Sequence, residues 1–211
     1  MERTRFLARV RQGLAGVQGQ PLPEAFPATP ASGTDRSPER FLTALRAADG
    51  DGAIVDRGGL VGAIASVAAS VDPARRPAVV TADTGDYATE IAEALARAHV
   101  EATSPTRENA ARAGLGITSA LLGVASTGSV LIASGVDSPR AASILPEAHL
   151  VILPADRLVA GLEEALEAVA SIAGAYSNPF LVTGPSRTSD IEMQTVIGVH
   201  GPRSVFVIVV R

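Results

Sequence analysis

Apolar runs of strand length alternate with segments of helical pattern over most of the chain, and this alternation constrains the fold more than any other feature. The strand-like runs include GAIVD (52–56), PAVVTA (77–82), AHLVILP (148–154) and SVFVIVV (204–210). Segments typical of helices lie between them, among them GGLVGAIASVAASV (58–71), DYATEIAEALARAHV (86–100) and DRLVAGLEEALEAVASIAGA (156–175). Such alternation predicts βαβ units. We therefore expect an α/β fold, with a mixed, largely parallel open sheet and helices on both faces.

The N-terminal part of the chain does not follow this alternation. Four apolar residues recur there at the spacing of an amphipathic helix, namely Phe6, Leu7, Val10 and Leu14. A segment rich in proline and glycine follows, and Ser37 with Pro38 then predicts the start of the next helix. We expect an N-terminal helix with an extended arm at 1–36 and an α/β domain at 37–211. The arm is either a disordered tether or a contact to a neighbouring subunit of a homo-oligomer.

Composition excludes several classes of function. The chain has 211 residues, no cysteine and a formal net charge of −4. Without cysteine it offers no disulfide, thiolate nucleophile or iron–sulfur ligand of its own. The acidic balance and an aromatic content of 3% argue against nucleic acid as a partner. The three histidines show no metal-binding spacing and no dinucleotide-binding glycine motif is present, so we expect no metal and no cofactor.

The apolar runs are also too short to predict a membrane span. None approaches the roughly 20 residues that a membrane-spanning helix needs. The N-terminal sequence MERTRFLARVRQGL lacks the apolar core of a secretion signal. We therefore expect a cytoplasmic protein.

The stretch GPSRTSDIEMQTVIGVHGP (184–202) gathers glycines, acids, hydroxyls, an arginine and a histidine. It follows a strand-like run, and open α/β sheets bind their ligands beyond the carboxyl ends of strands. Ser189 and the glutamate three residues later match a capping box, so a helix start with anion-attracting N–H groups is expected there. The stretch therefore predicts a site for a small carboxylate or phosphate. Its candidate binding residues are Gly184, Ser186, Arg187 and Thr188.

Two interpretations of Arg187 remain open. The guanidinium either grips the anion or pairs with Asp190 or Glu192 and locks the turn. Asp190, Glu192 and His200 are the candidate acid–base groups of the stretch. His200 lies in a glycine-rich turn, where its imidazole either bonds a neighbouring loop or transfers protons. His149, at the start of a strand-like run, has the same two interpretations.

Two more polar positions follow other strand-like runs, and a third precedes one. Thr118 comes directly after LGI, and SPRAASILP (138–146) follows VLIASGVD. In ASTGS (125–129), hydroxyls surround a glycine whose neighbouring N–H groups suit an anion, and Ser126, Thr127 and Gly128 are the candidates there. The same sequence is equally typical of a plain turn before a strand.

Two segments resemble a known family. TGPSRTSDIEMQTVIGVHGP (183–202) resembles the C-terminal signature of the lactate utilization protein C family of LUD-domain proteins. AGLGITSALLGVASTGSVLI (113–132), followed by RAASILPEAHLVILPADRLV (140–159), resembles the central segment of that family. The resemblance implies a fold similar to the NagB/RpiA/CoA-transferase group. It also implies an accessory role in oxidising L-lactate to pyruvate, together with iron–sulfur partner subunits.

One position departs from the family pattern. Family members commonly carry an acid in a motif like A-E-T-G-T, whereas this chain has Ser126 at the matching place. Related CoA-transferases use a glutamate as nucleophile, and a serine cannot replace that carboxylate without an activating partner. Whether the chain is an enzyme therefore stays open. The alternatives to an accessory subunit are a stand-alone enzyme acting on a sugar phosphate or a CoA thioester, and a ligand-sensing or structural protein.

Overall fold

The computed structural model describes residues 3–15, 33–71, 76–135, 138–171, 176, 178–188 and 196–211. The chain divides into two units, Met1–Pro30 and Ala31–Arg211. The first unit contains helix α1 (Arg3–Leu14), none of whose residues is buried. Its apolar stripe of Phe6, Leu7, Val10 and Leu14 is therefore exposed. Among the described helices, none is both long enough and apolar enough to span a bilayer.

A six-stranded parallel sheet forms the centre of the second unit. Its strand order is β1-β12-β7-β4-β2-β3, and every neighbouring pair is parallel. The bounds are β1 (Asp51–Val55), β2 (Ala78–Val80), β3 (Ala102–Thr103), β4 (Leu115–Ser119), β7 (Ala148–Pro154) and β12 (Ser204–Val210). The continuous apolar runs of β7 and β12 are buried on both faces, as parallel strands usually are.

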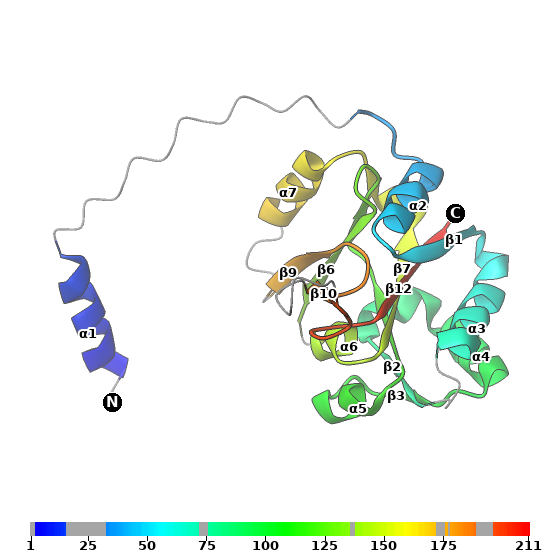
Figure 1. The fold of residues 1–211 in the computed structure, drawn as a ribbon, viewed down its shortest axis with the longest axis horizontal. Coiled ribbons are helices and arrows are strands. Elements are labelled where there is room, and N and C mark those ends of the chain that lie inside the picture. The colour runs from blue at the N-terminus through cyan, green and yellow to red at the C-terminus, as the bar shows by residue number, and fades with distance from the viewer. Residues whose placement is uncertain are drawn as a thin grey trace. The chain divides into compact units, whose positions relative to one another are not determined.

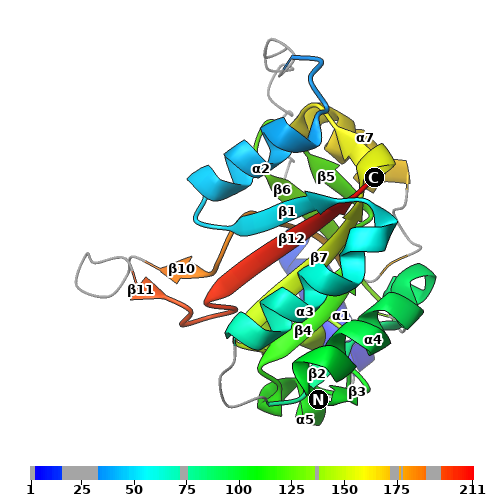
Figure 2. The ribbon, with the colours of Figure 1, turned by 90° about the vertical axis from the view of Figure 1, so that its right-hand side faces the viewer.

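Helices α3 (Leu60–Val71) and α4 (Ala88–Ala98) cover one face of this sheet, as Figure 2 shows. The short helical turns η1 (Arg57–Gly59) and η2 (Ala82–Tyr87) lead into them. Leu60 and Leu95 from the helices pack with Ile117 and Leu150 from the strands in one buried cluster. Side chains alternate along a strand, so this cluster uses every second residue of β4 and β7.

The other face carries a second sheet of four strands in the order β8-β5-β6-β9. These strands are β5 (Leu122–Val124), β6 (Ser129–Ser134), β8 (Leu158–Val159) and β9 (Asn178–Val182). Helix α7 (Leu162–Ser171) packs on the outer side of this sheet, so the layers in Figure 1 run from α7 through both sheets to α3 and α4. The expected fold class is confirmed, but the sequence did not predict the second sheet.

Three helices and a small ribbon complete this face. The helices are α2 (Pro38–Ala47), α5 (Arg107–Arg112) and α6 (Ala141–Ile144), the turn η3 (Ala155–Arg157) follows β7, and the ribbon joins β10 (Arg187–Thr188) to β11 (Val196–Ile197). The predicted start of α2 is confirmed, because the Ser37 hydroxyl accepts a hydrogen bond from the backbone N–H of Arg40.

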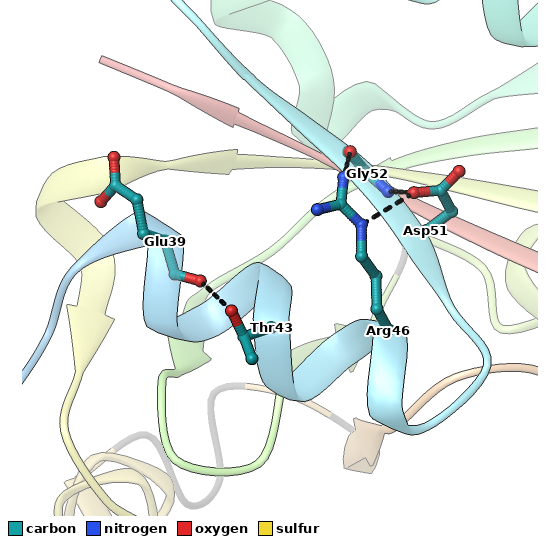
Figure 3. A network of polar contacts seen from close by, with 5 residues as sticks. All are labelled: Glu39, Thr43, Arg46, Asp51 and Gly52. Atoms are coloured by element: carbon teal, nitrogen blue, oxygen red, sulfur yellow. Dashed lines mark hydrogen bonds and ion pairs between the residues drawn. The ribbon is translucent and has the colours of Figure 1, made fainter.

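The end of α2 is anchored on the edge strand β1, as Figure 3 shows. Nη2 of Arg46 donates to the carbonyl oxygen of Gly52 at 3.0 Å, and its Nε lies 3.3 Å from Oδ1 of Asp51. The guanidinium thus provides a hydrogen-bond donor to a backbone carbonyl group of the edge strand. Unpaired backbone groups on such an edge can otherwise form hydrogen bonds with a strand of another chain.

Candidate functional site

The polar stretch near the C-terminus does not lie where the sequence pattern indicated. It follows β9, which belongs to the second sheet and runs antiparallel to β6. The expectation that it lies beyond a carboxyl end of the parallel sheet is wrong. Its far end, the turn at 198–203, leads into β12 and therefore lies at the amino ends of the parallel strands. A short apolar run carries no signal for which of two sheets it joins.

A cavity of about 260 Å³ opens between this stretch, α6 and the beginning of β7 and β12. Its lining residues are Arg140, Ser143, Ile144, His149, Phe180, Leu181, Val182, Thr183, Gly184, Ser186, His200, Gly201, Pro202 and Val205. Three of the residues proposed from sequence, Gly184, Ser186 and His200, therefore share one cavity. Two others line it as well: His149, for which the sequence left a structural and a proton-transferring role open, and Arg140, which was not proposed as a site residue.

His149 is the second residue of β7, and its side chain is 0% exposed. Its Nε2 atom lies 2.9 Å from Oγ1 of Thr118, which is itself buried. Its Nδ1 atom has no hydrogen-bond partner within the described part of the chain. Burial lowers the pKa of His149 to about 4, so the ring is neutral at neutral pH. His149 is thus a fully buried member of the cavity lining.

A missing side chain on β4 lets α6 come close to this histidine. Gly116 is the register partner of His149, and a Cβ atom on Gly116 would lie 1.9 Å from the carbonyl oxygen of Ala142. The backbone of α6 therefore packs directly on the sheet beside the imidazole. Only glycine permits this approach.

Arg140 supplies positive charge to the cavity. Its side chain is exposed, and its Cζ atom lies 5.5 Å from the ring centroid of Phe180, within the range of a cation–π contact. Among the described residues, Arg140 forms no ion pair, and none of the described aspartates and glutamates lines the cavity. The positive charge of Arg140 favours an anion.

Arg187 points elsewhere. Its Nη1 lies 3.0 Å from Oδ2 of Asp49, and its Nη2 donates to the carbonyl oxygen of Ala48. Both partners belong to the end of α2, so Arg187 ties the β10–β11 ribbon to that helix. Thr188 pairs with Val196 in the same ribbon. Asp190 and Glu192, with the predicted capping box, lie outside the described residues.

The turn at 125–129 is connected to the cavity by hydroxyl groups. Thr127 Oγ1 lies 2.7 Å from Ser129 Oγ, which in turn lies 2.6 Å from Oγ1 of Thr183, a lining residue. Gly128 has φ +66°, and a Cβ atom there would lie 2.1 Å from the backbone nitrogen of Leu45. The glycine thus lets the turn pack against α2.

Ser126, the residue that departs from the family pattern, lies in another place. It lines a separate cavity of about 500 Å³ beside α2, together with Ser37, Glu39 and Thr43. Thr118 does not line the first cavity, but its hydroxyl contacts His149, which does. The structure therefore does not bring the proposed residues together at one site: Gly184, Ser186 and His200 line one cavity, Ser126 lines another, and Arg187 contacts the end of α2.

The carboxyl ends of the parallel strands carry a further cavity of about 490 Å³, whose polar lining residues are Arg57, Tyr87, Asp156 and Arg211. Both arginines are already paired there. Arg57 Nε lies 2.5 Å from Glu90 Oε1 and holds the pKa of that carboxyl below its ordinary value, while Arg211 donates to Glu39. Paired arginines attract an anion less. Across the described ranges, no group of three or more His, Asp or Glu side chains is placed to hold a metal.

Comparison with known proteins identifies the family. Residues 78–210 match the LUD domain. The chain is 35% identical over 99 residues to "Lactate utilization protein C" of Bacillus subtilis, which covers 45% of this chain and 41% of that protein. It is 34% identical over 119 residues to the protein of the same name from Oceanobacillus iheyensis, covering 53% and 51%. The matched part thus spans about half the length of these relatives.

A solved structure supports the same assignment at the level of the fold. The crystal structure of a DUF162 family protein from Deinococcus radiodurans superimposes with a TM-score of 0.56. The two chains are 23% identical, and the match covers 82% of this chain and 95% of the other. The fold and the sequence match lead to one conclusion, that the chain belongs to the LUD-domain family.

Proposed function

We propose that this chain serves lactate utilization by binding a small carboxylate in the cavity that contains His149 and Arg140. Relatives named "Lactate utilization protein C" support the physiological role. The shape and chemistry of the cavity support the ligand class. The site belongs to the proposed LUD-like domain at 37–211.

The observation that carries the proposal is the buried Nδ1 atom of His149, which has no hydrogen-bond partner among the residues that the structure describes. A buried polar group without a hydrogen bond costs about 1–3 kcal/mol, and a ligand oxygen at Nδ1 would recover that energy. Arg140 adds a charge-assisted contact for an ionised ligand. Hydroxyl groups of Ser143 and Ser186 belong to the same lining and offer further contacts.

The size of the cavity favours a small acid. At about 260 Å³ it lies below the roughly 300–1,000 Å³ that is usual for drug-sized ligands. A three-carbon hydroxy or oxo acid fits such a volume with several waters.

On this proposal the chain is an accessory subunit. The resemblance to the family implies that iron–sulfur partner proteins take part in oxidising L-lactate to pyruvate, and the absence of cysteine from this chain is compatible with that role. The cavity that contains His149 and Arg140 would then bind L-lactate or pyruvate and retain it or pass it to a partner. His200, exposed at the cavity lining, lies where such a partner or the ligand can reach it.

Deletion of the gene, followed by complementation, tests this role. We expect the deletion strain to grow poorly on L-lactate, wild type and Arg187→Ala to restore growth, and Arg140→Ala to restore it weakly. Affinity purification from lactate-grown cells is expected to recover cluster-binding proteins. Normal growth of the deletion strain, with no second copy of the gene, contradicts the proposal. Turnover of a sugar phosphate or CoA thioester by the purified chain would favour the enzyme instead.

A further inference from the structure

We infer that Phe180 positions Arg140, holding its guanidinium at the cavity with N–H groups free for a carboxylate. The carrying observation is their cation–π contact, in which Cζ of Arg140 lies 5.5 Å from the centroid of the Phe180 ring. Both residues line the cavity. This inference rests on the proposed function, since it names the residue that orients the charged group of that site. The contact itself, however, is a property of the free protein and can be measured without any ligand.

The ring of Phe180 is held by the core between the two sheets. Phe180 lies on β9, where its register partner is Ile132 of β6. Its side chain is half-buried and packs against the buried cluster that contains Ile132 and Val205. Side chains in a packed core keep a defined orientation, so the remaining surface of the ring offers a fixed support at the cavity.

The backbone of Arg140 is fixed as well, but its side chain needs a partner. Arg140 directly precedes α6, and its carbonyl oxygen accepts a hydrogen bond from the Ser143 hydroxyl at 3.0 Å. The long side chain has several rotatable bonds, and ordering it during ligand binding costs conformational entropy. A contact that orders the guanidinium in the free protein reduces that cost.

The kind of partner decides what the guanidinium can still bind. Within the described part of the chain, the guanidinium of Arg140 forms no hydrogen bond and no ion pair. An aromatic ring attracts the cation through its face, without an acceptor oxygen that would occupy the N–H donors. Arg187, by contrast, donates to Ala48 and pairs with Asp49. Arg140 therefore keeps donors for the two oxygens of a carboxylate.

Carbon–proton NMR of the full-length ¹³C-labelled chain tests whether the contact forms in solution. The ring current of an aromatic side chain shifts the signals of groups above its face to lower frequency. Arg140→Lys identifies the Cδ–H signals of Arg140 by their loss. We expect these signals to be shifted in wild type and in Phe180→Tyr, and to take the ordinary position of an exposed arginine in Phe180→Leu. Signals at the ordinary position in wild type, or signals that Phe180→Leu leaves shifted, overturn the inference.

Calorimetric titration with L-lactate measures what the positioning contributes to binding. An exposed cation–π contact corresponds to a factor of about 2–5 in an equilibrium constant, so Phe180→Leu should bind L-lactate about 3-fold more weakly. Phe180→Tyr keeps the ring and should stay within about 1.5-fold of wild type. Equal affinities of wild type and Phe180→Leu contradict the inference.

A double-mutant cycle separates positioning from a direct contact between ring and ligand. In the Arg140→Ala background, Phe180→Leu should have no further effect on affinity, because the ring acts through the arginine. An equal loss in both backgrounds would overturn the inference. Shifted Arg140 signals in a protein that binds neither L-lactate nor pyruvate would reject the proposed function and leave the positioning of Arg140 by Phe180 in place.

Discussion

Arg187 reaches across to Asp49, with 3.0 Å between its Nη1 and the carboxylate oxygen Oδ2. The same guanidinium bonds the carbonyl oxygen of Ala48 at the end of α2. The arginine that the sequence marks as a possible anion ligand thus fastens the C-terminal ribbon to a helix more than a hundred residues earlier in the chain. Because this contact joins two distant segments of the chain, we expect it to stabilise the fold.

Replacing Arg187 is therefore expected to weaken the fold. Arg187→Ala removes one exposed ion pair and one hydrogen bond to a carbonyl, which together contribute about 1–2 kcal/mol. Urea denaturation measures the loss. Arg140→Ala serves as the comparison and should lower the free energy of unfolding by no more than the roughly 0.5–1 kcal/mol of its exposed cation–π contact with Phe180. Equal stability of Arg187→Ala and wild type would contradict this account.

Gly184 is predicted to tolerate no side chain. Its φ is +68°, and a Cβ atom would lie 2.0 Å from the carbonyl oxygen of Ala48. Gly184→Ala should lower the free energy of unfolding by at least about 2 kcal/mol. The control is Gly62→Ala in the exposed face of α3, where a Cβ meets nothing within 4 Å. That change should stabilise the helix by up to about 1 kcal/mol. Similar effects of the two changes would refute the packing argument.

The buried His149 gives the stability a defined pH dependence. Its pKa falls from 6.5 to about 4 on folding, so the unfolded chain binds the proton more tightly. The contribution of His149 to stability is therefore fully present above pH 6.5 and is lost as the pH falls toward 4, by about 3 kcal/mol in all. Denaturation of wild type and His149→Gln between pH 7.5 and 4 measures it, with the exposed His200→Gln as control. Parallel curves for wild type and His149→Gln would show that the ring is not buried in its neutral form.

Helix α1 is predicted to be unstable alone. It has 12 residues and buries none of them, and isolated helices shorter than roughly 12–15 residues are marginal in water. A peptide of residues 3–15 should show little helical circular dichroism. A strongly helical peptide would mean that the sequence itself, without a contact to its apolar stripe, stabilises the helix.

The central sheet could be predicted because its strands carry their signal locally. The run Leu150 to Leu153 is apolar at every position, which is typical of a strand buried on both faces. The second sheet carries no such signal. Its strand β5 has three residues and β8 has two, and neither is long enough to show a period. Their pairing depends on contacts between distant segments, which a pattern along the chain does not contain.

The candidate site was likewise only partly predictable from local sequence patterns. Gly184 and His200 stand out within one polar stretch, and both line the cavity with His149. The importance of His149 depends on Thr118, 31 residues away, and on the missing side chain of Gly116. In sequence it is a lone histidine before an apolar run. Arg140 looks like an ordinary surface arginine, and its position at the cavity follows from the packing of α6 on the sheet.

Calorimetric titration of the full-length chain with L-lactate and pyruvate tests the central claim most directly. We predict one-to-one binding of at least one of these acids to wild type. Binding should be at least about 10-fold weaker in Arg140→Ala and within about 2-fold of wild type in Arg187→Ala. Ser126→Ala, which alters the separate cavity beside α2, should also leave the affinity unchanged. Absence of binding at millimolar concentrations, or equal losses in Arg140→Ala and Arg187→Ala, would contradict the assignment of this cavity as the carboxylate site.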